Sequence, residues 1–398
     1  MKIKLGVFFG GKSVEHEVSI ITAVQAMAAL DPEKYEVIPI YITKDERLFT
    51  GPDIGNIEKY KDIPALLKNS VRILLLNDNG RIKLIRYPFK KFGGSVIGEI
   101  EVAMPLGHGT NVEDGALQGL LQSFGIAYTG CGVLSAACGM NKYTMKVLLD
   151  DAGIPVLPAV KLSSFNYVKD REKAIKNILD NYNLPVIVKP INLGSSIGVK
   201  IAHTRESLAE AIEHALLFSG EILIERAITR LREINVSVLG DSEYAEASEC
   251  EEPISGKEIL DFEEKYLSQN KKAVKSVSVG MSSLNRKIPA LISSELREKI
   301  RELGIRAFQT LGCSGVARID FMLDVNDGDA LYLTEINTLP GSLSFYLWEP
   351  VGLKYKDLLD RLISLALKRK RLEQNVNFSF KSNILAGYNP KAGKGMKS

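Results

Sequence analysis

Two short polar runs near the end of the chain have the residue types and spacing that a magnesium site needs. Arg318 and Asp320 lie two residues apart in one predicted strand. Glu335 and Asn337 lie two residues apart in the next. Side chains two residues apart on a strand share a face. If the strands pair with these faces together, three oxygen ligands and a guanidinium converge, which suits Mg²⁺ with bound phosphate. The alternative is a solvent-exposed hairpin face.

A second candidate is a glycine- and serine-rich loop that follows a predicted strand. Lys189 closes the strand, and the loop contains Gly194, Ser195 and Ser196 before the next strand begins. One cation, two hydroxyls and several backbone N–H groups suit the phosphates of a nucleotide held under a flap. The alternative is an ordinary polar hairpin.

Residues 6–13 fit a third pattern, the phosphate-binding loop G-x-x-x-x-G-K-S. That loop needs a flexible turn between its glycines, whereas the valine and two phenylalanines found here favour a strand interior. We therefore predict a strand and a Gly-Gly turn that exposes Ser13, Glu15 and His16 at the carboxyl end of the strand. Ligands of α/β sheets bind at such ends. The alternative is a phosphate-binding loop that uses Lys12.

Composition limits the class of protein. The chain has 398 residues, of which 45% are hydrophobic and 25% charged, and its formal net charge is +3. These values exclude an intrinsically disordered chain and disfavour binding to nucleic acid through bulk charge. No run approaches the ~20 apolar residues needed to cross a bilayer, so we expect no membrane association. The four cysteines lack metal-ligand spacing, which indicates reduced thiols in a cytoplasmic protein.

Hydrophobic periodicity and turn residues predict the elements that position these groups. The first part should be a parallel α/β domain with strands at 3–9, 35–42 and 100–106, helices near 15–30 and 114–124, and a hairpin over 71–87. Later elements should be mainly paired strands with helices: strands 184–189, 197–202, 222–226, 233–239, 244–251, 316–323 and 330–336, and helices 205–217, 294–311 and 355–370. Thr204 is the expected N-cap of the helix at 205–217.

In their order along the chain, these motifs resemble the ATP-grasp superfamily and, within it, the D-alanine–D-alanine ligases. The resemblance extends from residue 4 to about residue 370. Its segments are 9–19 (FGGKSVEHEVS), 108–109 with 113–119, the loop 189–198, 264–268 (EKYLS), 318–320 and 335–341 (EINTLPG). One such motif alone is weak evidence, but the ordered set is specific.

The resemblance implies a ligase that uses ATP and two Mg²⁺ ions, for which Mn²⁺ can substitute, to make D-alanyl-D-alanine for bacterial peptidoglycan. The family phosphorylates the carboxylate of a first D-alanine, and the amine of a second attacks the acyl phosphate. A tetrahedral intermediate then collapses to dipeptide, with ADP and phosphate as the other products. An acyl phosphate hydrolyses readily, so the site must exclude water. The long polar segment 252–292 is the natural lid.

Matching motifs also carry the site residues of the family onto this chain. The expected nucleotide-binding residues are Lys142, Lys189, Ser195 and Ser196 at the phosphates, Lys265 from the lid, and Glu225 and Glu233 at the adenine and ribose. The expected metal ligands are Asp320, Glu335 and Asn337. The expected catalytic set is Glu15, Ser195 and Tyr266, with Arg318 and the backbone N–H of Gly341 at the oxyanion. The expected substrate residues are Glu15, which would hold the first ammonium, and His108, Arg318, Gly341, Ser342 and Ser344.

The chain departs from the common family pattern in three places. Asn141 stands where an aspartate usually precedes Lys142, and residues 110–112 replace a glycine-containing stretch. Residues 342–347 (SLSFYL) replace a Ser/Thr-rich run whose hydroxyl contacts the second substrate. The acceptor is therefore open, with D-serine or D-lactate as alternatives to D-alanine. Tyr266 favours an amine acceptor. A catalytically inactive relative is disfavoured by the intact polar pairs on the late hairpin.

The resemblance also predicts the domain organisation and the partners. We expect an N-terminal α/β substrate domain at 1–130, a central lid domain at 131–224, a C-terminal mainly antiparallel catalytic domain at 225–370 and a basic tail at 371–398. The expected partners are the small molecules D-alanine and ATP, without nucleic acid or membrane. Members of the family are commonly homodimers, but no interface is legible in the sequence.

Overall fold

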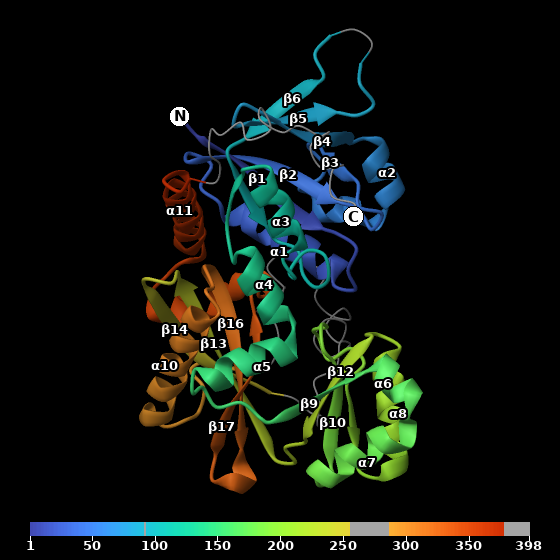
Figure 1. The fold of residues 1–398 in the computed structure, drawn as a ribbon. Coiled ribbons are helices and arrows are strands. Elements are labelled where there is room, and N and C mark those ends of the chain that lie inside the picture. Colours follow the sequence, from blue (N-terminus) through green and yellow to red (C-terminus); the bar gives the residue numbers. More distant parts are fainter. Residues whose placement is uncertain (91–92, 255–285, 378–398) are drawn as a thin grey trace, which may run out of the picture.

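The computed structural model describes residues 1–90, 93–254 and 286–377. Within these residues the chain forms three β-sheets, each with its own helices (Figure 1). The sheet of the first 130 residues lies at the top of Figure 1, and the other two lie side by side below it.

The first sheet has eight strands in the order β6-β5-β4-β3-β2-β1-β7-β8. Its strands are β1 (Ile3–Gly10), β2 (Tyr35–Ile42), β3 (Leu48–Thr50), β4 (Val71–Asp78), β5 (Arg81–Arg86), β6 (Val96–Ile100), β7 (Val102–Pro105) and β8 (Ala127–Tyr128). Four of them, β2, β1, β7 and β8, are parallel, as predicted. The predicted hairpin is β4–β5, and it extends this same sheet through antiparallel pairs, which was not predicted.

Both faces of the first sheet are covered, which explains why β1 is almost wholly apolar. Leu5, Val7 and Phe9 pack toward α1 (His16–Ala29), whereas Phe8 packs with α3 (Ala116–Ser123). The short helices η1 (Ile57–Lys61) and α2 (Ile63–Lys68) complete this region. Residues 7–10, which separate Gly6 from Gly11 in the G-x-x-x-x-G-K-S pattern, are thus inside a strand. A phosphate-binding loop is excluded there.

The second sheet has four antiparallel strands in the order β11-β10-β12-β9. Its elements are β9 (Ala159–Ser163), β10 (Val186–Pro190), β11 (Lys200–Ala202) and β12 (Glu221–Arg226), with helices α6 (Ser164–Lys169), α7 (Arg171–Asn181) and α8 (Arg205–Leu216). The predicted hairpin around the serine-rich loop is β10–β11. The side chain of Thr204 caps α8 through the backbone N–H of Ser207, as predicted.

The third sheet is antiparallel, in the order β15-β14-β13-β16-β17. Its strands are β13 (Leu231–Gly240), β14 (Ala245–Pro253), β15 (Arg286–Lys287), β16 (Gly315–Asp324) and β17 (Ala330–Asn337). The helices α4 (Val133–Met140), α5 (Lys142–Asp151) and α10 (Ser294–Thr310) form a core against one face. Alternate residues of β13, Ile234, Val236 and Val238, enter that core, so the residues between them face the other way.

The remaining described elements connect the first and third sheets. They are η4 (Gly341–Leu347), η5 (Glu349–Val351) and α11 (Tyr355–Gln374), whereas η3 (Val325–Asp327) links β16 to β17 within the third sheet. Leu358, Leu359 and Leu362 of α11 lie in one hydrophobic core with β1 and with Val316 of β16. The four-part division of the chain stays a prediction. Two observations concern its bounds: α4 and α5, which follow residue 130, pack with the third sheet, and β12 of the second sheet ends at Arg226.

Across the described ranges, no helix has both the length and the apolar character that a bilayer crossing requires.

Candidate active site

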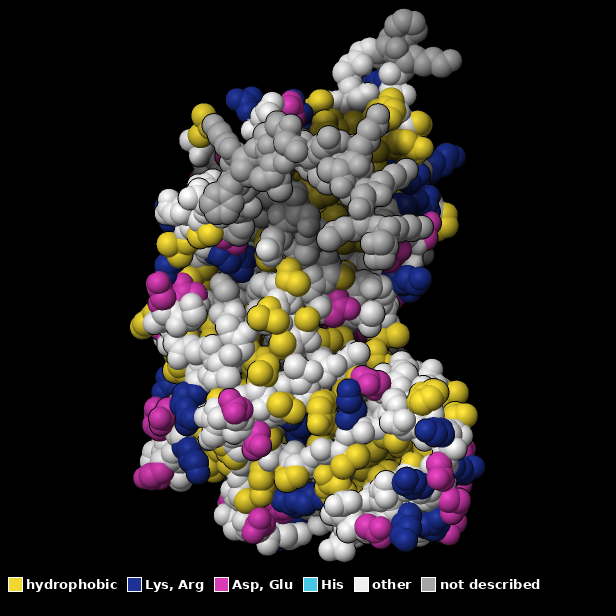
Figure 2. All heavy atoms as spheres, in the orientation of Figure 1, with side chains coloured by type: hydrophobic (Ala, Val, Ile, Leu, Met, Phe, Trp, Pro, Cys, Tyr) yellow, Lys and Arg dark blue, Asp and Glu magenta, His cyan; other side chains and the backbone are white. Residues whose placement is uncertain are grey.

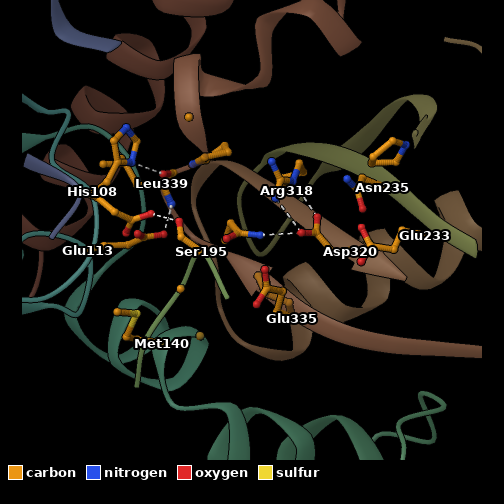
Figure 3. Close-up of a pocket in the computed structure, with 18 of the residues that line it drawn as sticks. His108, Glu113, Met140, Ser195, Glu233, Asn235, Arg318, Asp320, Glu335 and Leu339 are labelled. Atoms are coloured by element: carbon orange, nitrogen blue, oxygen red, sulfur yellow. Dashed lines mark hydrogen bonds and ion pairs between the residues drawn. The ribbon is translucent and has the colours of Figure 1, made fainter. Parts of the chain in front are cut away.

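A cleft is lined by residues from all three sheet regions. Figure 3 shows His108, Glu113 and Ser195 at one end, Asp320 and Glu335 in the middle, and Asn235 and Glu233 at the other end. Segments far apart in sequence therefore form one cavity, as expected for an enzyme that brings several substrates together. Figure 2 shows the exterior of the molecule in the orientation of Figure 1.

The predicted register of the late hairpin is correct. Asp320 of β16 pairs with Glu335 of β17, and Arg318 pairs with Asn337. The intervening isoleucines pair with each other on the opposite, buried face. A β-bulge after Asp320 lets Leu333 return to the core while Glu335 keeps facing the cleft. The two polar runs thus form one polar surface.

This polar surface extends across four strands. Asn235 of β13 pairs with Asp320 on one side and with Glu251 of β14 on the other. Glu251, Asn235, Asp320 and Glu335 therefore make a row on the cleft face of the sheet. Glu233 lies on the same face, two residues before Asn235. A row of carboxylate and amide oxygens, rather than a single pair, lines this side of the cleft.

Arg318 and Asp320 form a bidentate ion pair within one strand. The guanidinium Nε and Nη2 atoms each donate to a different Asp320 oxygen at 2.7 Å. The amide nitrogen of Asn337 also donates to Asp320, at 3.1 Å. Burial opposes the charge on Arg318, but the adjacent carboxylate outweighs it and raises the pKa of the guanidinium well above its usual value. Arg318 is a fixed cation in the middle of the cleft.

The donor set of this surface fits a hard divalent cation. Asp320 and Glu335 supply carboxylate oxygens, and Asn337 supplies an amide oxygen. In the described part of the chain, no cluster of three or more His, Cys, Asp or Glu side chains is arranged as a metal site, so the amide would be the third donor. The ammonium of Lys142 lies 3.5 Å from Glu335 and donates to the carbonyl of Leu193 at 2.7 Å.

Lys189 is held beside a second lysine that the sequence did not single out. The buried carboxylate of Glu225 lies 2.5 Å from the Nζ atom of Lys189 and 2.8 Å from that of Lys146. Burial alone would raise the pKa of Glu225, but the two lysines reverse this effect and hold it below its usual value. Burial lowers the pKa of Lys146. The carboxylate of Glu225 is thus enclosed by ammonium groups, and it does not line the cleft where adenine contact was predicted.

Asn141 takes over the local role of the more usual aspartate. Its side-chain oxygen accepts a hydrogen bond from the backbone N–H of Thr144 at 2.9 Å and caps α5. The cap positions Lys142 at the first turn of the helix, so this departure from the family pattern leaves the lysine in place.

At the other end of the cleft, Glu15 accepts a hydrogen bond from the hydroxyl of Ser195. This contact joins the first sheet region to the loop after β10. Glu15 and His16 are both buried, so the prediction that the Gly-Gly turn exposes them is wrong. His16 contacts the carbonyl of Gly11 and the hydroxyl of Tyr41, and it supports the turn. Only Glu15 of the two reaches the cleft.

His108 is a neutral imidazole in a chain of hydrogen bonds. Its Nδ1 atom lies 3.0 Å from the carbonyl of Leu339, which can only accept, so Nδ1 carries the hydrogen. Its Nε2 atom then accepts from the hydroxyl of Thr22 at 2.9 Å. Burial lowers the pKa of His108 even though Glu15 opposes this shift. His108 lines the cleft, as predicted.

Glu113 is a site residue that belongs to a family motif but has no role assigned from the sequence. Its two carboxyl oxygens accept from the backbone N–H groups of Gly109 and Leu339, at 3.1 and 3.3 Å. Burial and the nearby charge of Glu15 raise the pKa of Glu113 to about 8. Glu113 therefore holds a proton at neutral pH, and the neighbouring charged group is Glu15.

The segment after Gly341 departs from the prediction. Ser342, Leu343 and Ser344 all have positive φ, between 49° and 53°, and the turn directs both serines away from the cleft. The hydroxyl of Ser342 donates to Gln25 of α1 at 2.7 Å, and Ser344 is fully buried. Among the described residues, Gly341 and Tyr346 line the cleft but these serines do not. A substrate contact by either hydroxyl is therefore not formed here.

The remaining predicted residues differ in where they lie. Ser195, Glu233 and Gly341 line the cleft, whereas Ser196 lies in the same loop as Ser195 with a positive φ of 57°. Lys265 and Tyr266 lie outside the described residues. Sequence reasoning missed Asn235, Glu251 and Arg286 as cleft residues. Tyr346 lies in the unusual run after Gly341, which the sequence places at the acceptor pocket.

Comparisons with known proteins agree with this fold and cleft. Residues 4–131 match the family described as D-ala D-ala ligase N-terminus, and residues 148–364 match D-ala D-ala ligase C-terminus. A D-alanine--D-alanine ligase of Thermosipho melanesiensis is 38% identical over 384 residues, which cover 96% of this chain and 98% of the relative. One from Geobacillus kaustophilus is 37% identical over 392 residues, covering 96% and 99%.

Solved structures give the same result. The D-alanine-D-alanine ligase of Coxiella burnetii superposes with a TM-score of 0.77 at 28% identity, over 94% of this chain and 96% of that one. The VanG D-Ala:D-Ser ligase of Enterococcus faecalis gives 0.75 at 28% identity, over 92% and 100%. A D-alanine–D-alanine ligase of Bacillus anthracis complexed with ATP gives 0.64 at 26% identity, over 93% and 99%.

The three-sheet arrangement around one cleft is therefore that of a carboxylate–amine ligase of the ATP-grasp type. More particularly, the chain belongs to the D-Ala-D-Ala ligase family, as the ordered motifs predicted.

Proposed function

We propose that this chain is an ATP-dependent ligase that joins two molecules of D-alanine through an acyl phosphate. The observation that carries the proposal is the single cleft in which the Arg318–Asp320–Glu335–Asn337 surface faces the Glu15–Ser195 contact. One part of this cleft suits phosphate and metal, and the other suits an amino acid. The family names of the relatives support the same reaction.

The reaction consists of two transfers. A carboxylate oxygen of the first D-alanine attacks the γ-phosphorus of ATP, the bond to the β-phosphate oxygen breaks, and ADP leaves with that electron pair. The neutral amine of the second D-alanine then attacks the acyl carbon. A C–N bond forms, the C–O bond to phosphate breaks, phosphate leaves with the electron pair, and the amine loses a proton.

In this scheme Glu15 binds the ammonium of the first D-alanine, and Ser195 fixes the carboxylate of Glu15. Lys142 and Lys189 hold ATP phosphates, and Glu233 faces the ribose. Asp320, Glu335 and Asn337 would hold Mg²⁺, which would neutralise charge on the transferring phosphate. Arg318 and the N–H of Gly341 face the developing oxyanion, where a preplaced cation is most effective. Asp320 already orients Arg318 for that role.

His108 and Glu113 shape the amino-acid end of the cleft. Because His108 is neutral and Glu113 is protonated, Glu15 is the carboxylate that an incoming ammonium group meets. We place the reaction in the cytoplasm, where ATP is supplied, and we propose a homodimer by analogy with the family.

Phosphate release tests the proposal. The purified chain is incubated with Mg²⁺ and ATP and with D-alanine, D-serine, D-lactate or L-alanine, singly and in pairs with D-alanine, and the products are identified by mass. We expect phosphate release that depends on D-alanine, with an equal amount of D-alanyl-D-alanine. Release without a dipeptide or mixed product would contradict a ligase.

D-serine as the acceptor is the second candidate. It is supported by the similarity to the VanG D-Ala:D-Ser ligase and by the replacement of the expected hydroxyl run with a segment that presents Tyr346. A mixed product in the D-alanine plus D-serine reaction, formed in preference to the D-alanine dipeptide, would select this candidate.

A further inference from the structure

A buried polar cluster borders the cleft beyond Arg318 and has no part in the mechanism above. It consists of Glu251 on β14, Arg286 on β15, Asn235 on β13 and Tyr346 at the end of η4. All four line the same cleft as the polar row of the third sheet. The first and last of them in sequence are more than 100 residues apart, so the fold assembles the cluster.

The core of the cluster is a buried ion pair. The Nη1 atom of Arg286 lies 2.6 Å from Oε2 of Glu251, and the two side chains are only 8% and 2% exposed. Asn235 donates from its amide nitrogen to the other Glu251 oxygen at 3.1 Å, and the hydroxyl of Tyr346 lies 3.4 Å from it. The guanidinium carbon of Arg286 lies 4.1 Å from the centre of the Tyr346 ring. Glu251 and Tyr346 therefore fix the plane of the Arg286 guanidinium.

A buried ion pair of this kind contributes little net stability to a fold. Removing two charges from water costs several kcal/mol, and apolar residues of similar volume are often as stable or more so. A buried pair that also lines a substrate cleft therefore suggests a binding role. Asn235 supports this, because its nitrogen is committed to Glu251 and its Oδ1 atom, although buried, has no hydrogen-bond partner among the described residues. A ligand or its water shell would satisfy that oxygen.

The charges of the cleft indicate which ligand group belongs here. Of the described residues that line it, three carry a permanent positive charge: Lys142, Arg286 and Arg318. Lys142 lies beside Glu335, and Arg318 is bound through two nitrogens to Asp320. An acceptor amino acid brings an α-carboxylate that takes no part in the reaction and needs a cation. Arg286 on β15 is paired with Glu251, and both Glu251 and Tyr346 also lie close enough to Arg318 to influence its charge. The cluster therefore borders the proposed oxyanion position, beside which an acceptor must bind.

We propose that Arg286, held by Glu251 and Tyr346, binds the α-carboxylate of the acceptor and makes the enzyme select acceptors that carry one. The inference rests on the proposed ligase reaction and deepens it. The cluster positions the acceptor so that its amine reaches the acyl carbon, and it has no role in phosphorylation of the first D-alanine.

The experiment compares two nucleophiles that differ in the carboxylate. D-Alanine is the acceptor that carries one, and hydroxylamine traps the acyl phosphate as D-alanyl hydroxamate without one. Initial rates over a range of D-alanine concentrations give separate Michaelis constants for the two subsites. Arg286→Met should raise the acceptor constant about 10- to 100-fold, as loss of a charge-assisted hydrogen bond predicts. Hydroxamate formation, at D-alanine that saturates the first subsite but lies well below the acceptor constant, should change by less than about twofold. Arg286→Lys should restore part of the acceptor affinity.

A matched control is available one residue pair away. Arg232 of β13 forms a bidentate pair with Glu252 of β14, the residue next to Glu251, at 2.8 and 3.0 Å but outside the cleft. Arg232→Met should leave the acceptor constant unchanged. D-Alaninamide gives a second readout, because the wild type should use it far less well than D-alanine and Arg286→Met should lose most of that preference.

The outcomes separate the two proposals. An unchanged acceptor constant in Arg286→Met, or an equal loss of hydroxamate and dipeptide formation, would overturn the role of Arg286 while leaving the ligase reaction intact. A wild-type protein that forms neither hydroxamate nor dipeptide would overturn the ligase proposal, and this inference with it.

Discussion

Glu113 should make the stability of the protein depend on pH in a direction opposite to that of most carboxylates. Its pKa is about 8 in the folded chain, because of burial and the charge of Glu15, against an ordinary value of 4.5. Between these pH values the folded state holds a proton that the unfolded state has released. Stability therefore falls as pH rises through this window, and the contribution is complete only below the unfolded pKa.

The size of the effect follows from the shift. Each pH unit is worth about 1.4 kcal/mol, so a window of about 3.5 units gives an upper bound near 5 kcal/mol. Glu113 keeps partial access to solvent at the cleft, which screens its charge, so we expect about 2–3 kcal/mol. Glu113→Gln imitates the protonated carboxyl and removes the titration. The variant should be about as stable as wild type near pH 5 and about 2–3 kcal/mol more stable at pH 8.

Thermal unfolding of both proteins at half-unit intervals from pH 5 to pH 8.5 measures this difference. The two curves of Tm against pH should lie close together near pH 5 and separate as pH rises, with the variant the more stable at pH 8. Parallel curves would refute the reasoning, because they would mean that Glu113 binds no extra proton in the folded state. Glu15→Gln provides a check, since removal of the neighbouring charge should lower the pKa of Glu113 and narrow the window.

Three further predictions concern the cations of the cleft and its border. Arg318→Ala should lower kcat about 10²- to 10³-fold with little change in ATP affinity, and steady-state kinetics with D-alanine and ATP would show this; unchanged turnover would remove its oxyanion role. Lys189→Ala should abolish ATP binding measured by calorimetry, whereas Lys12→Ala should leave it intact, and the reverse pattern would contradict the placement of the ATP phosphates at the loop after β10. Glu225→Gln should cost about 3–5 kcal/mol in urea unfolding, because two lysines lose a buried partner. That cost should shrink when Lys146→Met is combined with it, and strict additivity would contradict a shared ion cluster.

Much of the site could be predicted from the sequence because its residues follow the two-residue periodicity of strands. The two-residue spacing of Arg318 and Asp320, and of Glu335 and Asn337, determined which groups share a face, and the hairpin register then brought the faces together. The same logic identified residues 3–9 as a strand, because apolar residues on consecutive positions need burial on both faces.

The parts that were missed depend on contacts between distant segments. Glu251 and Arg286 lie 35 residues apart with no pattern linking them, and only the pairing of β14 with β15 brings them together. The serines after Gly341 were predicted as substrate ligands from the resemblance to a Ser/Thr-rich run of the family. Three successive positive φ angles direct their side chains elsewhere, and such a turn of non-glycine residues has no sequence signature.

The path of one oxygen atom distinguishes activation of a carboxylate from simple hydrolysis of ATP. D-Alanine labelled with ¹⁸O in both carboxylate oxygens is incubated with the chain, Mg²⁺ and unlabelled ATP, and the released phosphate is analysed by mass. An acyl phosphate requires that one carboxylate oxygen becomes the bridge to phosphorus and leaves with it, so each phosphate should carry one ¹⁸O and the dipeptide bond should retain the other. Unlabelled phosphate would mean that ATP is hydrolysed without activating the carboxylate, and the assignment of this cleft to a ligase reaction would then be wrong.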